Sequence, residues 1–215
     1  MEGKVRATVR LAMREDAATI VKLIKELADF EELSHACFVT EEKLLASLWQ
    51  LPPFEGPTVF MLEVGEVDEK AAEVVKPDGD DQPEEVAFEP IVRVVVPKKP
   101  IDDPGKDDFQ SAHVPGRTVA GFALFFPTYS TFLCQRGYHM EDLYVRKPFR
   151  STGFGTLLLK SVVQQAKKLG AGRVEWCVLD WNVNAIKFYE ALGAVVMPEW
   201  RICRLAGDAL LTCAL

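Results

Sequence analysis

The chain has 215 residues, of which 48% are hydrophobic and 27% are charged, and its formal net charge is −7. This composition is that of a globular protein and excludes fibrous or globally disordered chains, while the acidic balance argues against nucleic acid as a partner. The apolar runs fall far short of the roughly 20 residues that cross a membrane, and the N-terminus has no apolar signal core, so we expect a cytoplasmic protein that contacts no membrane.

The spacing of apolar residues predicts the first elements. Alternation predicts a strand over 5–11. Asp16 fits the N-cap of a helix that follows it, and Thr40 fits the N-cap of a second, shorter helix that ends near Trp49. A further strand is predicted over 58–64.

Residues 65–118 differ from the rest of the chain. They hold 14 acidic and 7 basic residues and 7 of the 13 prolines, whereas the other 161 residues hold 18 acids and 18 bases. Charged, proline-rich segments bury little apolar surface, which favours a solvated, mobile insertion between two strands, with one strand of its own over 91–96. A docking or gating role is the alternative.

After this insertion, strands and helices alternate. Strands are predicted over 119–126, 138–145 and 173–179, helices over 153–169 and 182–192, and two further strands close the chain. Strands on both sides of each late helix imply at least one β-α-β crossover. The expected fold class is therefore α/β or α+β: a single domain with one mixed sheet and flanking helices, interrupted at 65–118.

The five cysteines show no paired spacing and lie apart from the three histidines. This pattern favours neither a disulfide framework nor a metal site. We therefore expect no metal, and thiols that are reduced and mostly buried.

The sequence Arg150-Ser-Thr-Gly153-Phe-Gly155-Thr lies between a predicted strand and a predicted helix. Glycines there let the backbone approach a ligand closely, and the helix offers free N–H groups and the positive end of its dipole. Together these features predict a cradle for a diphosphate. The motif lacks the GK[ST] ending of a P-loop and the third glycine of a dinucleotide fingerprint, and a purely structural turn is the alternative.

The next helix opens with Asn182 and Asn184, the only asparagines of the chain. One of them can cap the helix, or its amide can reach a ligand. Further along, Tyr189 lies one position off the apolar face, so its hydroxyl needs a polar partner.

Two adjacent carboxylates, Glu141 and Asp142, interrupt an apolar predicted strand. Adjacent strand residues point to opposite faces, so one carboxylate faces inward unless the strand bends there. A buried acid is costly unless it is paired or functional, and perturbed carboxylates cluster at functional sites. The pair is therefore a candidate for chemistry.

In this order and spacing, the three features resemble the GNAT superfamily of N-acetyltransferases. The segment 23–31, the Glu141-Asp142 pair and the Trp200-Arg201 ending are similar to the spermidine/spermine N-acetyltransferases. The strings VEWCVLDWNVNAIKFYEALGA and EWRICRL, with the acidic insertion, are similar to the plant members of that group, which act on ornithine, diamines or aromatic amines such as tyramine. The resemblance covers nearly all of the chain outside 65–118.

The resemblance implies a homodimer that uses acetyl-CoA as cosubstrate and a small-molecule amine as acceptor. It assigns acetyl-CoA to the backbone of Leu143, Tyr144 and Val145, to the loop Arg150, Ser151, Thr152, Gly153, Phe154, Gly155 and Thr156, and to Asn182, Ala185 and Tyr189. It assigns the amine to Phe30, Glu31, Glu141, Asp142, Glu199 and Trp200. Tyr189 would protonate the departing thiolate as general acid, and Glu141 would accept the amine proton through water as general base.

The chemistry of amine acetylation agrees with these assignments. An alkyl amine has a pKa of about 10.4, so the site must bind a cation and then take its proton. Carboxylates can do both. A backbone N–H of the strand that contains Leu143 can stabilise the charge that develops on the acetyl oxygen.

The sequence departs from the mammalian polyamine enzymes in two places. Phe30 stands where they carry a tyrosine, and the run before Trp200 is shorter. Both changes fall in the amine pocket, where they favour a shorter or more apolar amine than spermine. Two other functions stay open: a protein lysine or N-terminal acetyltransferase, and a non-catalytic CoA-binding module, against which the presence of Glu141 and Tyr189 argues.

Overall fold

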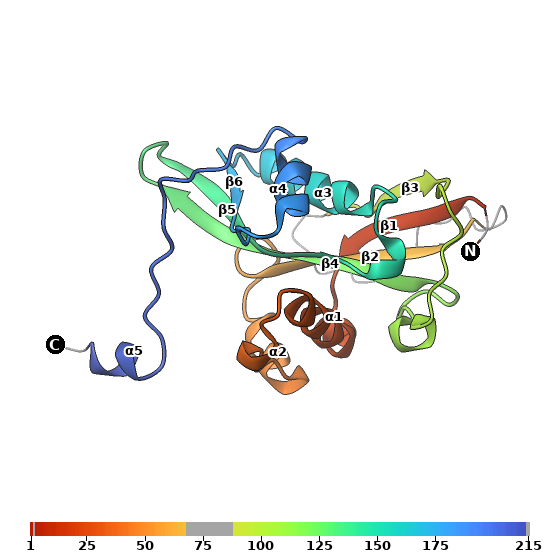
Figure 1. Cartoon of the computed structure of the whole chain (residues 1–215), viewed down its shortest axis with the longest axis horizontal. Helices are drawn as coiled ribbons and strands as arrows, with labels where there is room; N and C mark the ends of the chain where they lie inside the picture. Colours follow the sequence, from red (N-terminus) through yellow and green to blue (C-terminus); the bar gives the residue numbers. More distant parts are fainter. Residues whose placement is uncertain (2, 68–87, 214–215) are drawn as a thin grey trace. The chain divides into compact units, whose positions relative to one another are not determined.

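The computed structural model describes residues 1, 3–67 and 88–213. It contains a six-stranded sheet in the order β3-β1-β2-β4-β5-β6 (Figure 1). Neighbouring strands are antiparallel except β5 and β6, which are parallel, so the expected mixed sheet is confirmed. The strands are β1 (Val5–Leu11), β2 (Thr58–Glu66), β3 (Ile91–Val95), β4 (Thr118–Ser130), β5 (Gln135–Val145) and β6 (Val174–Trp176).

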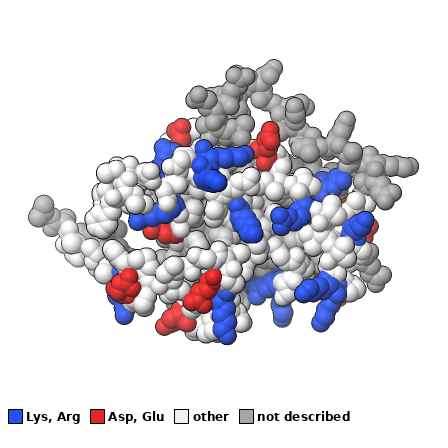
Figure 2. Space-filling model, turned by 90° about the horizontal axis from the view of Figure 1, so that it is seen from above, with Lys and Arg blue, Asp and Glu red and all other residues white. Residues whose placement is uncertain are grey.

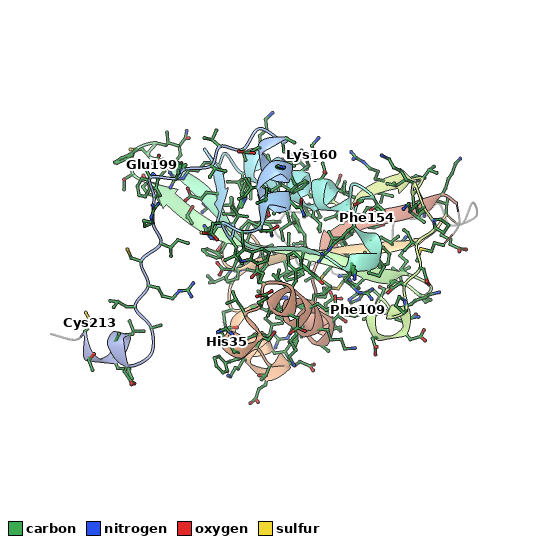
Figure 3. All side chains as sticks on the ribbon, in the orientation of Figure 1. His35, Phe109, Phe154, Lys160, Glu199 and Cys213 are labelled. Carbon is green, nitrogen blue, oxygen red and sulfur yellow. The ribbon has the colours of Figure 1, made fainter. Side chains whose placement is uncertain are left out.

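Helices cover both faces of this sheet (Figure 1). On one face lie α1 (Ala17–Phe30) and α2 (Glu41–Ser47), and on the other lies α3 (Phe154–Lys168). The apolar stripe of α1 packs on β2 and β4 in a cluster that includes Leu23, Phe109 and Phe122. The predicted apolar face of α3 is buried as expected for an amphipathic helix on a sheet. Figure 3 shows Phe109 and Phe154 on opposite sides of the sheet.

Both predicted N-cap positions precede a helix, but only one side chain caps it. The Thr40 hydroxyl accepts a hydrogen bond from the Lys43 N–H, as expected. The Asp16 carboxylate instead accepts bonds from the Met13 N–H and from the Arg10 guanidinium. Burial alone would raise the pKa of Asp16, but the hydrogen bonds and charge of Arg10 outweigh it and hold that pKa below its ordinary value.

Residues 88–118 of the insertion pack on the sheet, and its first residues, 65 and 66, belong to β2. Its predicted strand is β3, which pairs antiparallel with β1 as the edge of the sheet. Ile101 and Phe109 are buried, so this part contributes to the core. The preceding residues 68–87, on which the expectation of a solvated, mobile segment also falls, lie outside the described residues.

The chain divides into two compact units, Met1–Trp176 and Cys177–Leu215. The second unit contains α4 (Val183–Glu190) and α5 (Asp208–Thr212). The prediction of two closing strands is wrong, because no residue described after Trp176 pairs in a sheet. A strand needs a partner backbone as well as suitable side chains, and the local sequence cannot supply one.

Two other expectations are corrected. The strand predicted over 173–179 is limited to three residues of β6. The thiols are not mostly buried, because four of the five cysteines are exposed and Cys37 is half-buried. Among the described residues, no helix has the length and apolar character that a membrane span requires.

Candidate active site

The C-terminal half of β5 has one free edge within the unit Met1–Trp176. Its pairing with β6 ends at Met140 opposite Trp176. On the other side, Arg146 donates its N–H to Ala120 O at 2.9 Å, and Leu143 and Val145 lie opposite Ala123 and Gly121. Since bonded and non-bonded pairs alternate in an antiparallel ladder, the N–H and C=O groups of Leu143 and Val145 point away from β4. An extended ligand can pair with this edge.

A β-bulge lies at the start of this edge. Asp142 is opposite Leu124 and Met140 is opposite Phe125, so Glu141 is the extra residue of β5. Of the two alternatives left open by the sequence, the strand therefore bends here. A bulge re-aims the side chains around it, which lets both carboxylates serve the same side of the molecule.

Three carboxylates gather at this bulge. Burial raises the pKa of Asp142 to about 7, and the charges of Glu141 and Glu31 add to the effect. Burial also raises the pKa of Glu31, which follows α1 directly. Because like charges that are partly desolvated repel one another, this cluster is suited to a cationic ligand, which would relieve the repulsion. His139 Nε2 lies 3.7 Å from a Glu141 oxygen.

The loop before α3 has the backbone shape of an anion cradle. Ser151 and Gly153 both have positive φ, 62° and 88°. Gly153 is the N-cap residue of α3, and the first amide that bonds back into the helix is that of Leu157, which donates to Gly153 O at 3.0 Å. The N–H groups of the first turn of α3 are therefore available for a ligand, with the positive end of the helix dipole behind them.

The side chain of Arg150 folds back from this loop toward α1. Its Nε donates to Val145 O at 2.9 Å. Its guanidinium carbon lies 4.6 Å from the centroid of the Phe30 ring and 5.4 Å from that of Tyr144. The loop assigned to the cofactor thus contacts a residue assigned to the amine.

Basic side chains face solvent on the α3 side of the sheet. Figure 2 looks onto that face and shows Lys and Arg side chains spread over it, with acidic ones toward its margin. The exposed lysines of α3 are Lys160, Lys167 and Lys168, and Figure 3 shows Lys160 on the outer side of the helix. A surface of this sign suits a polyanionic ligand, even though the whole chain is acidic.

The remaining predicted site residues lie in the unit Cys177–Leu215. The Asn182 side-chain oxygen accepts the Ala185 N–H at 3.2 Å and so caps α4, which is the structural role left open by the sequence. Gly193, at φ 92°, ends the helix, with the Ala194 N–H bonded to Tyr189 O at 3.1 Å. The rings of Phe188 and Tyr189 lie 5.1 Å apart. Glu199 and Trp200 are exposed.

Sequence reasoning missed a set of residues beside β5. Tyr144 donates its hydroxyl to Glu26 of α1 at 3.3 Å. A hollow of about 610 Å³ opens beside it, lined by Glu26, Asp29, Asp103, Gly105, Arg146 and Lys147 among others. No local pattern joins residues this far apart in the chain, although the Asp-Asp-Pro-Gly sequence at 102–105 marks a turn.

Comparisons with known proteins identify the family of the chain. Residues 97–194 match the model of the Acetyltransferase (GNAT) family. A curated L-ornithine N5-acetyltransferase of Arabidopsis thaliana is 45% identical over 203 residues, which cover 94% of this chain and 85% of the relative. The chain belongs to the GNAT family of acetyltransferases and is therefore an acyltransferase.

Two relatives of lower sequence identity are named for other amines. A tyramine N-feruloyltransferase of Nicotiana tabacum is 31% identical, with 96% of this chain and 90% of the relative covered. A thialysine N-epsilon-acetyltransferase of Mus musculus is 29% identical, with 94% of each covered.

Solved structures share the fold. An aminoglycoside acetyltransferase from an uncultured soil metagenomic sample superposes with a TM-score of 0.57 at 11% identity, covering 93% of this chain and 95% of that one. A ribosomal-protein-alanine N-acetyltransferase of Brucella melitensis gives 0.54 at 12% identity, covering 92% and 98%. Identities this low show the fold alone.

Proposed function

We propose that this enzyme transfers an acetyl group from acetyl-CoA to the primary amine of a small di- or polyamine, an ornithine-like amine or an arylalkylamine. The observation that carries the proposal is the cluster of Glu31, Glu141 and Asp142 at the bulge of β5, next to the outward N–H of Leu143. The names of the relatives, which act on ornithine, tyramine and thialysine, support an amine acceptor.

The residues present fit acetyl-CoA. The positive φ angles of Ser151 and Gly153 and the first turn of α3 fit its diphosphate. The free edge of β5 at Leu143 and Val145 fits an extended amide-containing arm, although Val145 O already accepts from Arg150. When bound, acetyl-CoA would supply the activated acetyl group.

In this mechanism the carboxylates act first. The cluster binds the ammonium form of the amine by charge. Glu141, the most exposed of the three acids and the extra residue of the bulge, then accepts the proton through water as general base. The Leu143 N–H donates to the acetyl oxygen as negative charge develops on it, and Tyr189 donates its phenolic proton to the departing thiolate.

The amine specificity follows from the carboxylates and from the aromatic ring of Phe30. Asp142 and Glu31 provide negative charge for a cation, while Phe30 offers an apolar ring with Arg150 over it. The positive guanidinium disfavours a third or fourth ammonium group close to the ring. We therefore infer a diamine, ornithine-like or aromatic amine in preference to spermine.

We further propose that the enzyme acts as a cytoplasmic homodimer. In the unit Cys177–Leu215 several large apolar side chains are strongly exposed, among them Val195 at 84% and Leu211 at 75%. Exposed apolar groups of this size are typical of a surface that another chain covers. Sedimentation equilibrium would give twice the monomer mass, and a monomer would contradict the proposal.

Mass spectrometry of the products tests the transfer itself. Incubation with acetyl-CoA and ornithine should give a product heavier by one acetyl group. Feruloyl-CoA in place of acetyl-CoA tests the acyl group named for the tobacco relative, and a lysine-containing peptide as competitor tests the protein-acetyltransferase alternative. Acetylation of the peptide but of no free amine would contradict the proposal.

A further inference from the structure

Arg146 joins the cofactor edge of β5 to the diphosphate loop. Its N–H donates to Ala120 O at 2.9 Å, and its carbonyl accepts the Phe149 N–H at 2.9 Å. It thereby closes the ladder of β5 and starts the short turn Lys147–Phe149 that leads to Arg150. The position of this one residue sets where the loop begins.

The Arg146 side chain is buried and is held by a residue of the acidic insertion. Its side chain is 3% exposed and that of Asp103 is 4% exposed. Two parallel hydrogen bonds of 2.8 Å join the guanidinium to the two Asp103 oxygens. The Phe109 ring, also from the insertion, lies 3.7 Å from the guanidinium carbon. Bidentate pairing and ring stacking fix the orientation of an arginine as well as its charge.

Asp103 is itself held rigidly. Its Oδ1 accepts the Gly105 N–H at 3.2 Å, and a Cβ at Gly105 would lie 2.8 Å from an Arg146 nitrogen, so the turn fits closely around the pair. On either side Ile101 and Phe109 are buried. Lys22 of α1 donates to Asp108 O at 2.8 Å, which ties the segment to α1 as well.

No described residue offers Arg146 an equivalent second carboxylate. Glu26 lies nearest, with an oxygen 3.8 Å from Nε, a distance outside hydrogen-bond range, and its side chain is 38% exposed. Loss of the Asp103 charge would leave a buried guanidinium with this weaker partner. Since a buried charge without a close partner is strongly unfavourable, the Arg146 side chain would shift, and the turn that begins at its backbone would shift with it.

We propose that Asp103 is a positioning residue for acyl-CoA binding: through Arg146 it holds the end of β5 and the diphosphate loop in register. This inference rests on the proposed function of that loop. It gives the described C-terminal part of the insertion a role in the reaction, although Asp103 lies 43 residues before Arg146 in the sequence.

The test compares Asp103→Asn with Asp102→Asn. The two substitutions remove the same charge from adjacent positions, but Asp102 is exposed and Asp103 is not. Asp103→Asn should raise KM for acetyl-CoA about tenfold with kcat changed much less, because a displaced loop weakens cofactor binding. Asp102→Asn should stay within about twofold of the wild type, and Asp103→Glu should recover part of the loss. An unchanged KM in Asp103→Asn would overturn the inference.

Amide hydrogen exchange tests the positioning role of Asp103 independently of the proposed activity, and it also shows whether the variant is folded. In Asp103→Asn, peptides over 146–156 should exchange faster while peptides over 5–11 should not, whether or not the protein acetylates an amine. Equal protection of both segments in the variant and the wild type would contradict the coupling. If Asp103→Asn unfolds, Phe109→Leu keeps both charges and should show the same change in KM and exchange, to a smaller degree; no change in either would also overturn the inference.

Discussion

The Arg150 guanidinium lies 4.6 Å from the centroid of the Phe30 ring. Arg150 opens the loop assigned to the diphosphate, and Phe30 ends the helix assigned to the amine pocket. A cation–π contact therefore joins the loop assigned to the diphosphate to the helix assigned to the amine pocket. We expect a substitution on one side of this contact to change binding on the other.

Substitution of the ring tests this contact. Phe30→Leu keeps an apolar side chain but removes the aromatic face, which is worth about 0.5–1 kcal/mol at an exposed site. We expect KM for acetyl-CoA to rise roughly twofold to fivefold, in addition to any change in amine preference. Phe38→Leu, at a ring that is 75% exposed, is the control and should have no effect. A change in amine kinetics with acetyl-CoA kinetics intact would show that the contact carries no coupling.

The raised pKa of Asp142 gives the enzyme an acidic limb in its pH profile. Below its pKa of about 7, Asp142 takes up a proton and the carboxylate cluster loses one negative charge. A cationic amine then binds more weakly, so kcat/KM for the amine should fall as the pH falls below about 7. In Asp142→Asn this limb should disappear and kcat/KM should be low throughout. The same limb in the variant would assign the titration to another group.

The same substitution should stabilise the fold. The pKa of Asp142 is higher in the folded state than its ordinary value, so the folded protein resists an ionisation that the unfolded chain undergoes freely. Stability from this group is complete at low pH and is lost as the pH rises toward and through about 7. Asp142→Asn should therefore melt at a higher temperature than the wild type at pH 8 and at a similar temperature at pH 4, as differential scanning calorimetry can measure.

Glu141 is expected to act in catalysis and not in folding. Glu141→Gln should lower kcat by about 10²-fold or more, because general-base assistance is lost, and the loss should be greatest at lower pH, where the amine is hardest to deprotonate. Glu175→Gln, at a half-buried acid on the neighbouring strand β6, is the matched control. A loss that does not vary with pH would indicate that Glu141 only orients the substrate.

Tyr189 should contribute to the departure of the thiolate. Tyr189→Phe removes only the hydroxyl and should lower kcat by about 10²-fold, while the dissociation constant of CoA, measured by calorimetry, should hardly change. Tyr129→Phe, at an exposed tyrosine of β4, controls for the loss of a hydroxyl as such. Equal turnover by Tyr189→Phe and the wild type would remove the acid role.

Local patterns in the sequence were enough to predict the central strands and helices of the fold. Alternation predicted β1, an apolar run predicted β2, helical spacing predicted α1 and α3, and the turn before α3 was recognisable from its glycines. Each of these signals depends on residues a few positions apart. The bend at Glu141 was one of two alternatives left open by the sequence, because a regular strand would place the adjacent acids on opposite faces.

What the sequence could not show depends on pairs that are distant in the chain. The position of Asp16 before α1 predicts a helix cap, but in the folded protein its carboxylate accepts hydrogen bonds from Arg10 instead. The two strands expected at the end of the chain have no partner backbone among the residues described. The pairing of Asp103 with Arg146 joins a proline-rich acidic segment to the end of β5, and nothing in the composition of that segment indicates this pairing.

Thiol release from acetyl-CoA, measured with ornithine, 1,3-diaminopropane, putrescine, spermidine, spermine, thialysine, tyramine and serotonin, tests the central claim most directly. We predict turnover with one or more of these amines, and a higher specificity constant for a diamine, ornithine-like or aromatic amine than for spermine. The ranking would show whether the pocket selects a second charge or an aromatic ring. Binding of CoA without turnover of any amine would contradict the assignment as a small-amine acetyltransferase.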